Sequence, residues 1–194
     1  MTDVERRIQR DGIRAAREED AHGDRALAFH ADNYLAPQAS VTTGPATDTS
    51  RAEQIQKAVA ADRYAFFTGF FKDFYNTDLL LGKRVSEQAV QASWNIAAGA
   101  SATASLACIP TWHEDFREDL AQIDVPTLVI PGDADRILPI TTSGLRTAKL
   151  IKGARLVVVK DGPHCIPWTH TEEVNAELLS FLSLKAGKLQ NKVA

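Results

Sequence analysis

Two short apolar runs near the carboxyl end of the chain limit its possible folds more than any other feature. The first is TLVI at residues 127–130 and the second is LVVV at residues 156–159. Neither run alternates apolar and polar residues, which predicts strands covered on both faces. Residues 141–152 have a helical pattern that ends near Gly153. A strand, a helix and a strand in this order predict two parallel strands joined by a right-handed crossover, as in an α/β sheet.

A polar residue follows each predicted strand at its carboxyl end. Asp135 follows the first strand and His164 follows the second, 29 residues later. Ligands of open α/β sheets bind at this edge. A carboxylate beside a histidine fixes the tautomer of the ring and stabilises the imidazolium that forms when the ring takes a proton. Asp135 and His164 are therefore the candidate acid and base of a catalytic site.

Two alternatives to this assignment remain open from the residues alone. Asp133 competes with Asp135 as the acid, although its place directly after Gly132 suits it better to accept hydrogen bonds from the backbone of the turn. Asp135 and His164 are also compatible with a purely structural role, in which both side chains stabilise their own loops.

The chain before the first strand is expected to be mostly helical. Residues 1–31 are rich in Arg, Asp, Glu and Ala, which predicts a polar helix or a flexible arm, and residues 36–50 form a turn-rich linker. An aromatic-rich helix is expected from Ser50, with Ser50 as its N-cap, and a second helix from about Ser86 to Ala107. After the second strand, Thr171 is expected to cap a last helix with one apolar face, formed by Val174, Leu178, Phe181 and Leu182.

Composition and charge exclude several classes of protein. The net charge of −3 and the pI near 5.9 argue against nucleic-acid binding. No run approaches about 18 apolar residues, so no membrane span is expected. The amino terminus lacks the apolar segment of a secretory signal. Cys108 and Cys165 have no metal-ligand spacing, and no metal site is expected; two isolated thiols favour a reducing cytoplasm.

Two stretches of the chain resemble a known family. PTLVIPGDADRILPI and DGPHCIPWTHTEEVNAELLSFL are similar to the carboxyl-terminal core of cofactor-free haloperoxidases and related aryl esterases of the α/β-hydrolase fold. The stretch from DRYAFFTGFF to TWHEDFREDL resembles the helical cap of that family. The resemblance covers about residues 52–185. It implies an arm and linker at 1–50, a cap at 51–122, a core at 123–186 and a tail at 187–194.

The resemblance also implies roles for particular residues. Asp135 matches the acid and His164 the base of the family's Ser-His-Asp triad. Four residues match positions that line an apolar acyl or aryl pocket, although plain core packing would explain them equally: Phe70, Phe74, Ile137 and Ile140. The implied substrate is a small ester or acyl compound, and no cofactor is implied.

The third member of the triad has no counterpart in this sequence. A nucleophile elbow reads G-x-S-x-G after a strand, and no serine of the chain lies in that pattern. Ser101 has only the first glycine and is expected to be a packing residue, Ser40 lies in the linker, and Cys165 is expected to be a small buried hydrophobe. The expected fold is therefore an incomplete α/β-hydrolase fold, a helical cap followed by the last two parallel strands and their helices.

Two functions follow from this combination. One is an esterase or haloperoxidase-type enzyme, with acid and base present and the nucleophile missing. The other is a non-catalytic, truncated remnant that acts as a binding or oligomerising module. Because two parallel strands need neighbours on their edges, the expected partners are other copies of the chain or a polypeptide that supplies the amino-terminal half.

Overall fold

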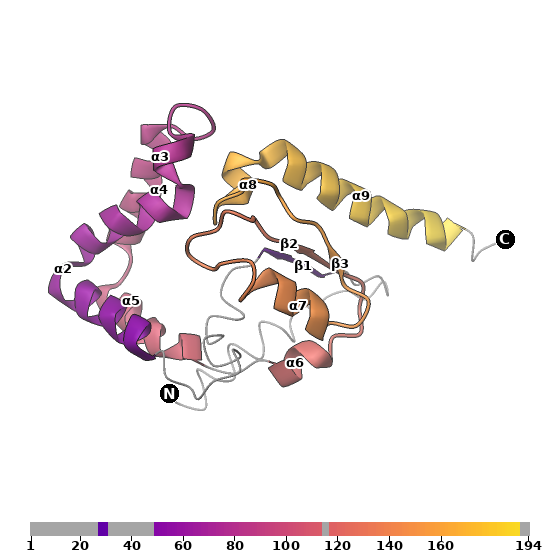
Figure 1. The fold of residues 1–194 in the computed structure, drawn as a ribbon, viewed down its shortest axis with the longest axis horizontal. Helices are drawn as coiled ribbons and strands as arrows, with labels where there is room; N and C mark the ends of the chain where they lie inside the picture. Colours follow the sequence, from indigo (N-terminus) through magenta and orange to yellow (C-terminus); the bar gives the residue numbers. More distant parts are fainter. Residues whose placement is uncertain (1–26, 31–48, 114–116, 191–194) are drawn as a thin grey trace.

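The computed structural model describes residues 27–30, 49–113 and 117–190 of the chain (Figure 1). Within these residues a parallel sheet has the strand order β1-β2-β3. The strands are β1 (Leu27–His30), β2 (Thr127–Ile130) and β3 (Arg155–Leu156). Leu27 pairs with Thr127, and Leu128 pairs with Arg155. The central strand, β2, is fully buried, as its unbroken apolar pattern predicted.

Strand β1 corrects the expectation that residues 1–31 form only a polar helix or a flexible arm. Leu27–His30 pair with all four residues of β2, from Thr127 to Ile130. The segment LAFH is short and follows a strongly polar stretch, so the pairing with β2 gives it a strand conformation that its own sequence does not specify. The other residues of the arm lie outside the described part of the chain.

The second apolar run is only partly the buried strand that was predicted. Its pairing with β2 extends through hydrogen bonds from the Val157 and Val159 amides to the carbonyls of Val129 and Pro131. Val159 is buried, but Leu156 and Val158 are exposed by 37% and 43%. The expectation that both faces are covered is therefore wrong for this strand, because Leu156 and Val158 remain exposed.

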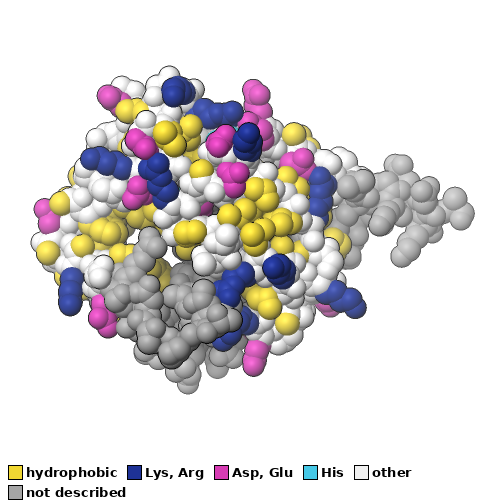
Figure 2. Space-filling view, in the orientation of Figure 1, with side chains coloured by type: hydrophobic (Ala, Val, Ile, Leu, Met, Phe, Trp, Pro, Cys, Tyr) yellow, Lys and Arg dark blue, Asp and Glu magenta, His cyan; other side chains and the backbone are white. Residues whose placement is uncertain are grey.

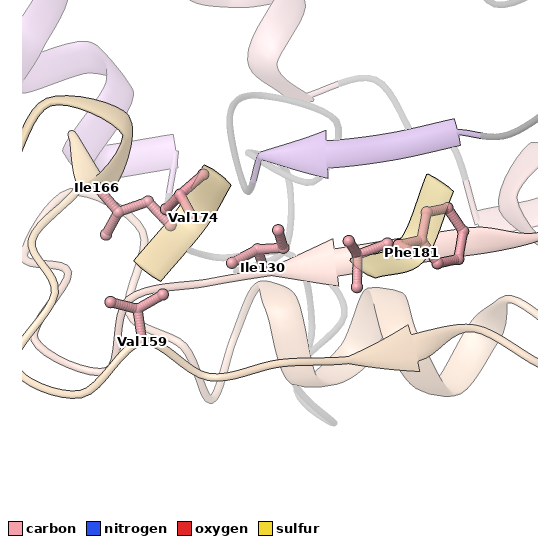
Figure 3. Packing of buried hydrophobic residues seen from close by; sticks show 6 residues of the cluster. Ile130, Val159, Ile166, Val174 and Phe181 are labelled. Carbon is pink, nitrogen blue, oxygen red and sulfur yellow. The ribbon is translucent and has the colours of Figure 1, made fainter. Parts of the chain in front are cut away.

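The covered faces of the sheet carry the core. In Figure 1, α7 (Gly144–Leu150) and α9 (Thr171–Gln190) lie on opposite sides of the strands, with the short α8 (Ile166–Thr169) leading into α9. Figure 3 shows side chains of the α9 side of the core packed together. This cluster consists of Leu128, Ile130, Val159, Ile166, Val174 and Phe181. A second cluster, beside α6 (Arg117–Ala121) and α7, consists of Leu120, Ile123 and Ile151.

Helix α9 differs from the expected last helix in two respects. Val174 and Phe181 are buried and Leu178 is half-buried, but Leu182 is 53% exposed and does not belong to the buried face. The helix also continues to Gln190, past the expected fraying point at Ala186. Thr171 does not cap it, since its hydroxyl donates to the carbonyls of Pro167 and Trp168 in the preceding turn.

A group of helices precedes β2, and all of them except α6, which lies beside α7, are to one side of the sheet (Figure 1). They are α2 (Thr49–Tyr75), α3 (Thr77–Leu80), α4 (Glu87–Gly99), α5 (Ala102–Cys108), the 3₁₀ helix η2 (Ile109–His113) and α6 (Arg117–Ala121). Aromatic residues at the end of α2 pack against α4 around buried Phe71, Tyr75 and Val85. Trp112 lies in η2, whereas Phe116 falls outside the described residues.

Two of the expected helices contain breaks. Helix α2 is interrupted at Asp62, whose backbone is extended and whose carboxylate accepts hydrogen bonds from the amides of Tyr64 and Ala65. The helix expected from Ser86 to Ala107 ends at Gly99 and restarts at Ala102. Arg63 closes the end of α4 by donating to the carbonyls of Ala98 and Ala100, which explains why the chain turns there.

The surface mixes apolar and charged side chains, with apolar patches visible on the face shown in Figure 2. In the described part of the chain, no helix is both long and apolar enough to cross a membrane.

Candidate active site

The structure brings Asp135 and His164 into direct contact. Nδ1 of His164 lies 2.8 Å from Oδ2 of Asp135, and both side chains are buried. Asp135 follows β2 and His164 follows β3, so neighbouring parallel strands deliver the two groups to the same edge of the sheet. A carboxylate only accepts hydrogen bonds, so Nδ1 carries the proton in this contact and Nε2 is the acceptor nitrogen of the neutral ring.

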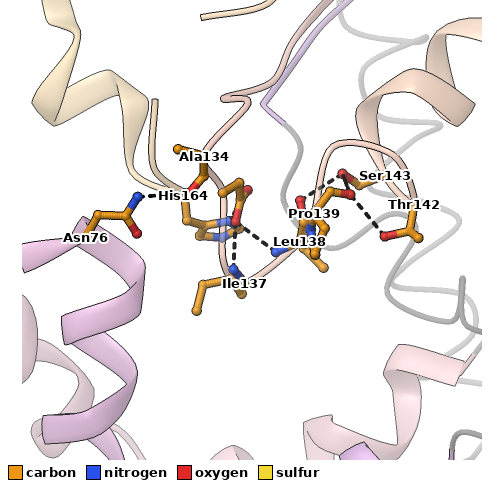
Figure 4. A network of polar contacts seen from close by, with 9 residues as sticks. Asn76, Ala134, Ile137, Leu138, Pro139, Thr142, Ser143 and His164 are labelled. Atoms are coloured by element: carbon orange, nitrogen blue, oxygen red, sulfur yellow. Dashed lines mark hydrogen bonds and ion pairs between the residues drawn. The ribbon is translucent and has the colours of Figure 1, made fainter. Parts of the chain in front are cut away.

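The carboxylate of Asp135 is held by its own loop. Its second oxygen, Oδ1, accepts hydrogen bonds from the amides of Ile137 and Leu138, each at 2.8 Å. The next residues are fixed by hydroxyls: Ser143 donates to the carbonyls of Leu138 and Pro139, and Thr142 also donates to Pro139 (Figure 4). With both oxygens engaged, the carboxylate is fixed in one orientation toward His164.

Asp133 has a different environment from Asp135. Its Oδ1 accepts a hydrogen bond from the amide of Asp161 at 2.6 Å, and the residue is exposed. This contact joins the loop after β2 to the loop after β3. Asp133 therefore has the backbone-binding role that its place after Gly132 suggested, and Asp135 is the aspartate in contact with the histidine.

The two loops approach each other very closely. The amides of Asp133 and Ala134 donate to the carbonyls of Val159 and Gly162. A Cβ atom at Gly132 would lie 2.1 Å from the Gly162 carbonyl oxygen, closer than any side chain tolerates. Asp161 has a left-handed backbone, with φ of 55°, that turns the chain back toward His164. These contacts set the separation of Asp135 and His164 through the backbone.

Of the four residues predicted to line a pocket, Phe74 has a ring contact with the acid–base pair. Its ring meets the His164 imidazole edge-on, with centroids 4.9 Å apart. Phe70 stacks on Phe74 at 5.5 Å and belongs to the aromatic cluster of α2. Ile137 contacts Asp135 through its backbone amide, and Ile140 is half-buried in the same loop. Their role as pocket residues stays a prediction.

Cys165 and His170 lie on either side of the short helix α8. Cys165 is half-buried and packs against the aromatic cluster of α2. Burial raises the pKa of the neighbouring Tyr75 hydroxyl, which is 2.7 Å from Ser93 Oγ and also hydrogen-bonded to Cys165. His170 is buried, its ring contacts the Thr169 hydroxyl, and its backbone carbonyl accepts a hydrogen bond from the Val174 amide at the start of α9.

Ser101 is neither a nucleophile candidate nor a packing residue. It is exposed and caps α5 by accepting the Ala104 amide, which corrects the packing role expected from the sequence. Among the residues that the structure describes, no three His, Cys, Asp or Glu side chains are grouped to hold a metal ion.

Comparison with known proteins places this arrangement in a family. Residues 43–171 match the family described as the alpha/beta hydrolase fold, which is more than half of the chain. The chain belongs to the alpha/beta hydrolase fold family. This confirms the expected fold class, and the described residues hold a partial version of that fold with β1 in addition to the two predicted strands.

Within this family, the chain is similar to several proteins named as haloperoxidases. The chain is 55% identical over 135 residues to a putative non-heme chloroperoxidase of Synechocystis sp., covering 70% of this chain and 49% of that protein. It is 36% identical over 132 residues to a non-heme haloperoxidase of Rhodococcus erythropolis, covering 66% and 47%. The bromoperoxidase structure from Bacillus anthracis aligns with a TM-score of 0.71 at 33% identity, covering 89% of this chain and 64% of that one. The resemblance to cofactor-free haloperoxidases is confirmed, and the chain spans about half the length of these curated relatives.

Two residues of the helical segment that contact the acid loop were not predicted from the sequence. Asn76 and Asp78, at the end of α2 and in α3, bind residues on either side of Asp135. No local pattern marks them, because their partners are 58 residues away in the sequence.

Proposed function

We propose that this chain supplies the acid and the base of a serine-hydrolase-type site, with Asp135 as the acid and His164 as the base. The observation that carries this proposal is the buried contact of 2.8 Å between His164 Nδ1 and Asp135 Oδ2. Its place at the carboxyl ends of neighbouring parallel strands, where this fold family binds its ligands, supports it further.

The chemistry follows from this geometry. Nε2 of His164 takes the proton of a nucleophilic hydroxyl as the hydroxyl oxygen attacks an ester carbonyl, and Asp135 stabilises the imidazolium that forms. His164 then protonates the departing alcohol and leaves an acyl-enzyme. Water converts this ester to the carboxylic acid. Hydrogen peroxide converts it instead to a peracid, which oxidises halide in solution, and the names of the relatives as haloperoxidases favour this second outcome. Neither route needs a metal or an organic cofactor.

The substrate we propose is a small ester or acyl compound. The aromatic ring of Phe74 covers one side of the His164 imidazole, and Phe70 extends this apolar surface. Ile137 and Ile140, just after the acid, would contribute aliphatic surface on the other side. These four side chains suit an apolar acyl or aryl group.

None of the serines in the sequence lies on a G-x-S-x-G elbow, which supports a nucleophile supplied from outside this sequence. We propose that a complementing amino-terminal polypeptide supplies it, with the first strands of the sheet. The edge of β1 that faces away from β2 offers such a polypeptide a place to pair.

A complementation assay tests the proposal. The chain alone should not hydrolyse p-nitrophenyl acetate above background. Mixed or co-expressed with the part of the Synechocystis chloroperoxidase that it does not match, it should do so. His164→Ala and Asp135→Asn should then lower the turnover by about 10³-fold or more, whereas the matched control Asp133→Asn should retain it. Turnover or fluorophosphonate labelling of the chain alone, lost in His164→Ala, would show a nucleophile within the chain and overturn this assignment.

The absence of an elbow also favours a second candidate, a non-catalytic binding or oligomerising module. This candidate predicts that the two polypeptides associate without any turnover, or that the chain associates with itself alone. Sedimentation of the mixture, measured beside the esterase assay, separates the two candidates.

A further inference from the structure

The turn that ends α2 contacts both loops of the acid–base pair. From the histidine loop, the amide of Cys165 donates to the carbonyl of Phe74 at 3.1 Å. The ring of Phe74 lies edge-on against His164. His164 and the residue after it are thus both held by a single residue of the helical segment.

Asn76 makes the corresponding contact with the acid loop. Its Nδ2 donates to the carbonyl of Ala134 at 2.8 Å, next to Asp135 in the chain (Figure 4). The side chain is only 1% exposed, and its Oδ1 is buried without a hydrogen-bond partner. The backbone of Asn76 is left-handed, with φ of 48° and ψ of 52°. A buried amide that leaves one acceptor unsatisfied is costly to keep, which indicates that the remaining bond to Ala134 matters.

Arg136, on the other side of Asp135, is also held from the helical segment. Its guanidinium makes two hydrogen bonds to the carboxylate of Asp78, at 2.8 and 3.0 Å, and lies 3.6 Å from Asp73. This pair is exposed, so water and salt weaken it. The bond from Asn76 is buried and is the stronger restraint.

We propose that the turn at residues 74–78 is a positioning clamp for the acid–base pair, with Asn76 as its main positioning residue. The peptide of Ala134 is held from two sides: its N–H donates to Gly162 in the histidine loop, and its carbonyl accepts from Asn76. Asn76 therefore fixes the acid loop at the point where that loop is already joined to the histidine loop. The assignment rests on the proposed roles of Asp135 and His164, and it gives the helical segment a part in holding them.

The Nδ1 proton of His164 provides the test. Because it lies in the buried contact with Asp135, it should give a downfield proton signal in NMR spectra of the 194-residue chain, and Asp135→Asn should abolish it. The rate at which this proton exchanges with water reports how firmly the contact is held. No substrate or nucleophile takes part, so the outcome is independent of the esterase assay.

Substitution of Asn76 by Gly removes the side-chain hydrogen bond to Ala134 and keeps the left-handed backbone of the turn. Glycine adopts the left-handed backbone without strain but has no amide to bind Ala134. In Asn76→Gly the Nδ1 proton should exchange about fivefold faster or more, as expected for the loss of one hydrogen bond. An unchanged exchange rate in Asn76→Gly would overturn the proposal and reduce Asn76 to a turn residue.

The amides of Val157 and Val159 serve as the folding reference, because both bind β2 away from the clamp. Their protection should be the same in the wild-type chain and in Asn76→Gly. Where Asn76→Gly loses this protection, the wild-type chain and Asn76→Gly are compared at a lower temperature at which the Val157 and Val159 amides are equally protected in both. A faster Nδ1 exchange in Asn76→Gly there supports the clamp, and an unchanged rate overturns it.

Discussion

Gly132 is the residue on which the approach of the two loops depends most directly. Its Cα lies so near the Gly162 backbone that a methyl group would be 2.1 Å from the Gly162 carbonyl oxygen and 2.8 Å from the Pro163 carbonyl oxygen. The obstacle is backbone, which cannot rotate away as a side chain would. Any side chain here must push the loop after β2 away from the loop that carries His164.

We predict that Gly132→Ala destabilises the chain by about 1–3 kcal/mol, because overpacking of this size forces the backbone to shift. Gly69→Ala is the matched control, since a Cβ there would meet no atom within 4 Å. Alanine also favours the helix, so the control should be neutral or up to about 1 kcal/mol more stable. Urea unfolding followed by circular dichroism measures both. Equal stability of the two variants would contradict the close approach.

His170 should make the stability of the chain depend on pH. Burial lowers its pKa from the ordinary value of 6.5 and Arg84 lowers it further, whereas Glu173, Asp161 and Asp133 oppose the shift. The folded state thus favours the neutral ring. As the pH falls below about 6.5 the unfolded chain takes up the proton first. The stability contributed by His170 is present above that pH and is lost as the pH falls through the lower folded pKa.

The measurement is the free energy of unfolding at pH 7.5 and pH 5.5, compared between the wild-type chain and His170→Gln. The difference between the two pH values should be smaller in the variant. Glu173 does not titrate between pH 5.5 and 7.5, because a hydrogen bond from its own backbone amide holds the pKa of its carboxyl below the ordinary 4.5. Asp78 does not titrate there either, because its hydrogen bonds with Arg136 hold its pKa below 3.8. An equal pH dependence in both proteins would show that His170 is not responsible.

Among elements, helix α2 contains the clearest internal boundary. Asp62 has an extended backbone in the middle of the helix, and its carboxylate accepts the amides of Tyr64 and Ala65. These bonds make it the N-cap of the aromatic half of α2, which carries Phe71 and Tyr75 into the core.

Replacement of Asp62 by Ala should therefore cost about 1 kcal/mol, the usual effect of losing an N-cap. Asp62→Asn keeps a side-chain oxygen that accepts the same amides and should cost much less. Thermal unfolding of the two variants tests this. If both lose the same stability, the charge of Asp62 matters and its cap does not.

The elements show what the sequence can and cannot predict. Strand β2 was predictable because four β-branched or aliphatic residues follow Pro126 directly, and a local pattern is enough when both faces are buried. Strand β1 was not predictable, since Leu27–His30 become a strand by pairing with residues 100 positions away. The break after Gly99 was missed because every residue of the segment AAGASATASLA is compatible with a helix.

The same distinction applies to the candidate site. Asp135 and His164 follow predicted strands, and so their meeting could be expected from topology. Asn76 follows an aromatic helix in a segment with no site motif, and its partner Ala134 contributes only a backbone carbonyl. Every residue has a backbone carbonyl, so this contact does not require a particular residue type at position 134 and the sequence gives no sign of it.

At the scale of the whole molecule, the described residues pair β2 on both sides and place no further strand beside β1 or β3. Strand β2 has neighbours on both sides, so the expected open edge beside it is already occupied by β1. The apolar side chains of Leu156 on β3 and of Val158 just after it remain exposed. Such surface on an outer strand favours association with further polypeptide.

We predict that the chain alone self-associates at micromolar concentration, and that Val158→Lys reduces this without loss of structure. Val157→Lys is the contrasting variant, because Val157 packs against the buried cluster under α9 and a charge there should unfold the core. Sedimentation velocity gives the size and circular dichroism the fold. A folded wild-type monomer at these concentrations would contradict the prediction.

The contacts between the loop after β2 and the loop after β3 determine where the chain could be divided into two polypeptides without separating Asp135 from His164. Asp135, His164 and the backbone bonds that join their loops all come from one continuous stretch between Thr127 and His170. A split anywhere upstream of this stretch keeps Asp135 and His164 on one polypeptide, whereas a split between these two residues separates them. The part of the chain that must stay continuous to keep the pair is thus set by two neighbouring strands and the helix between them.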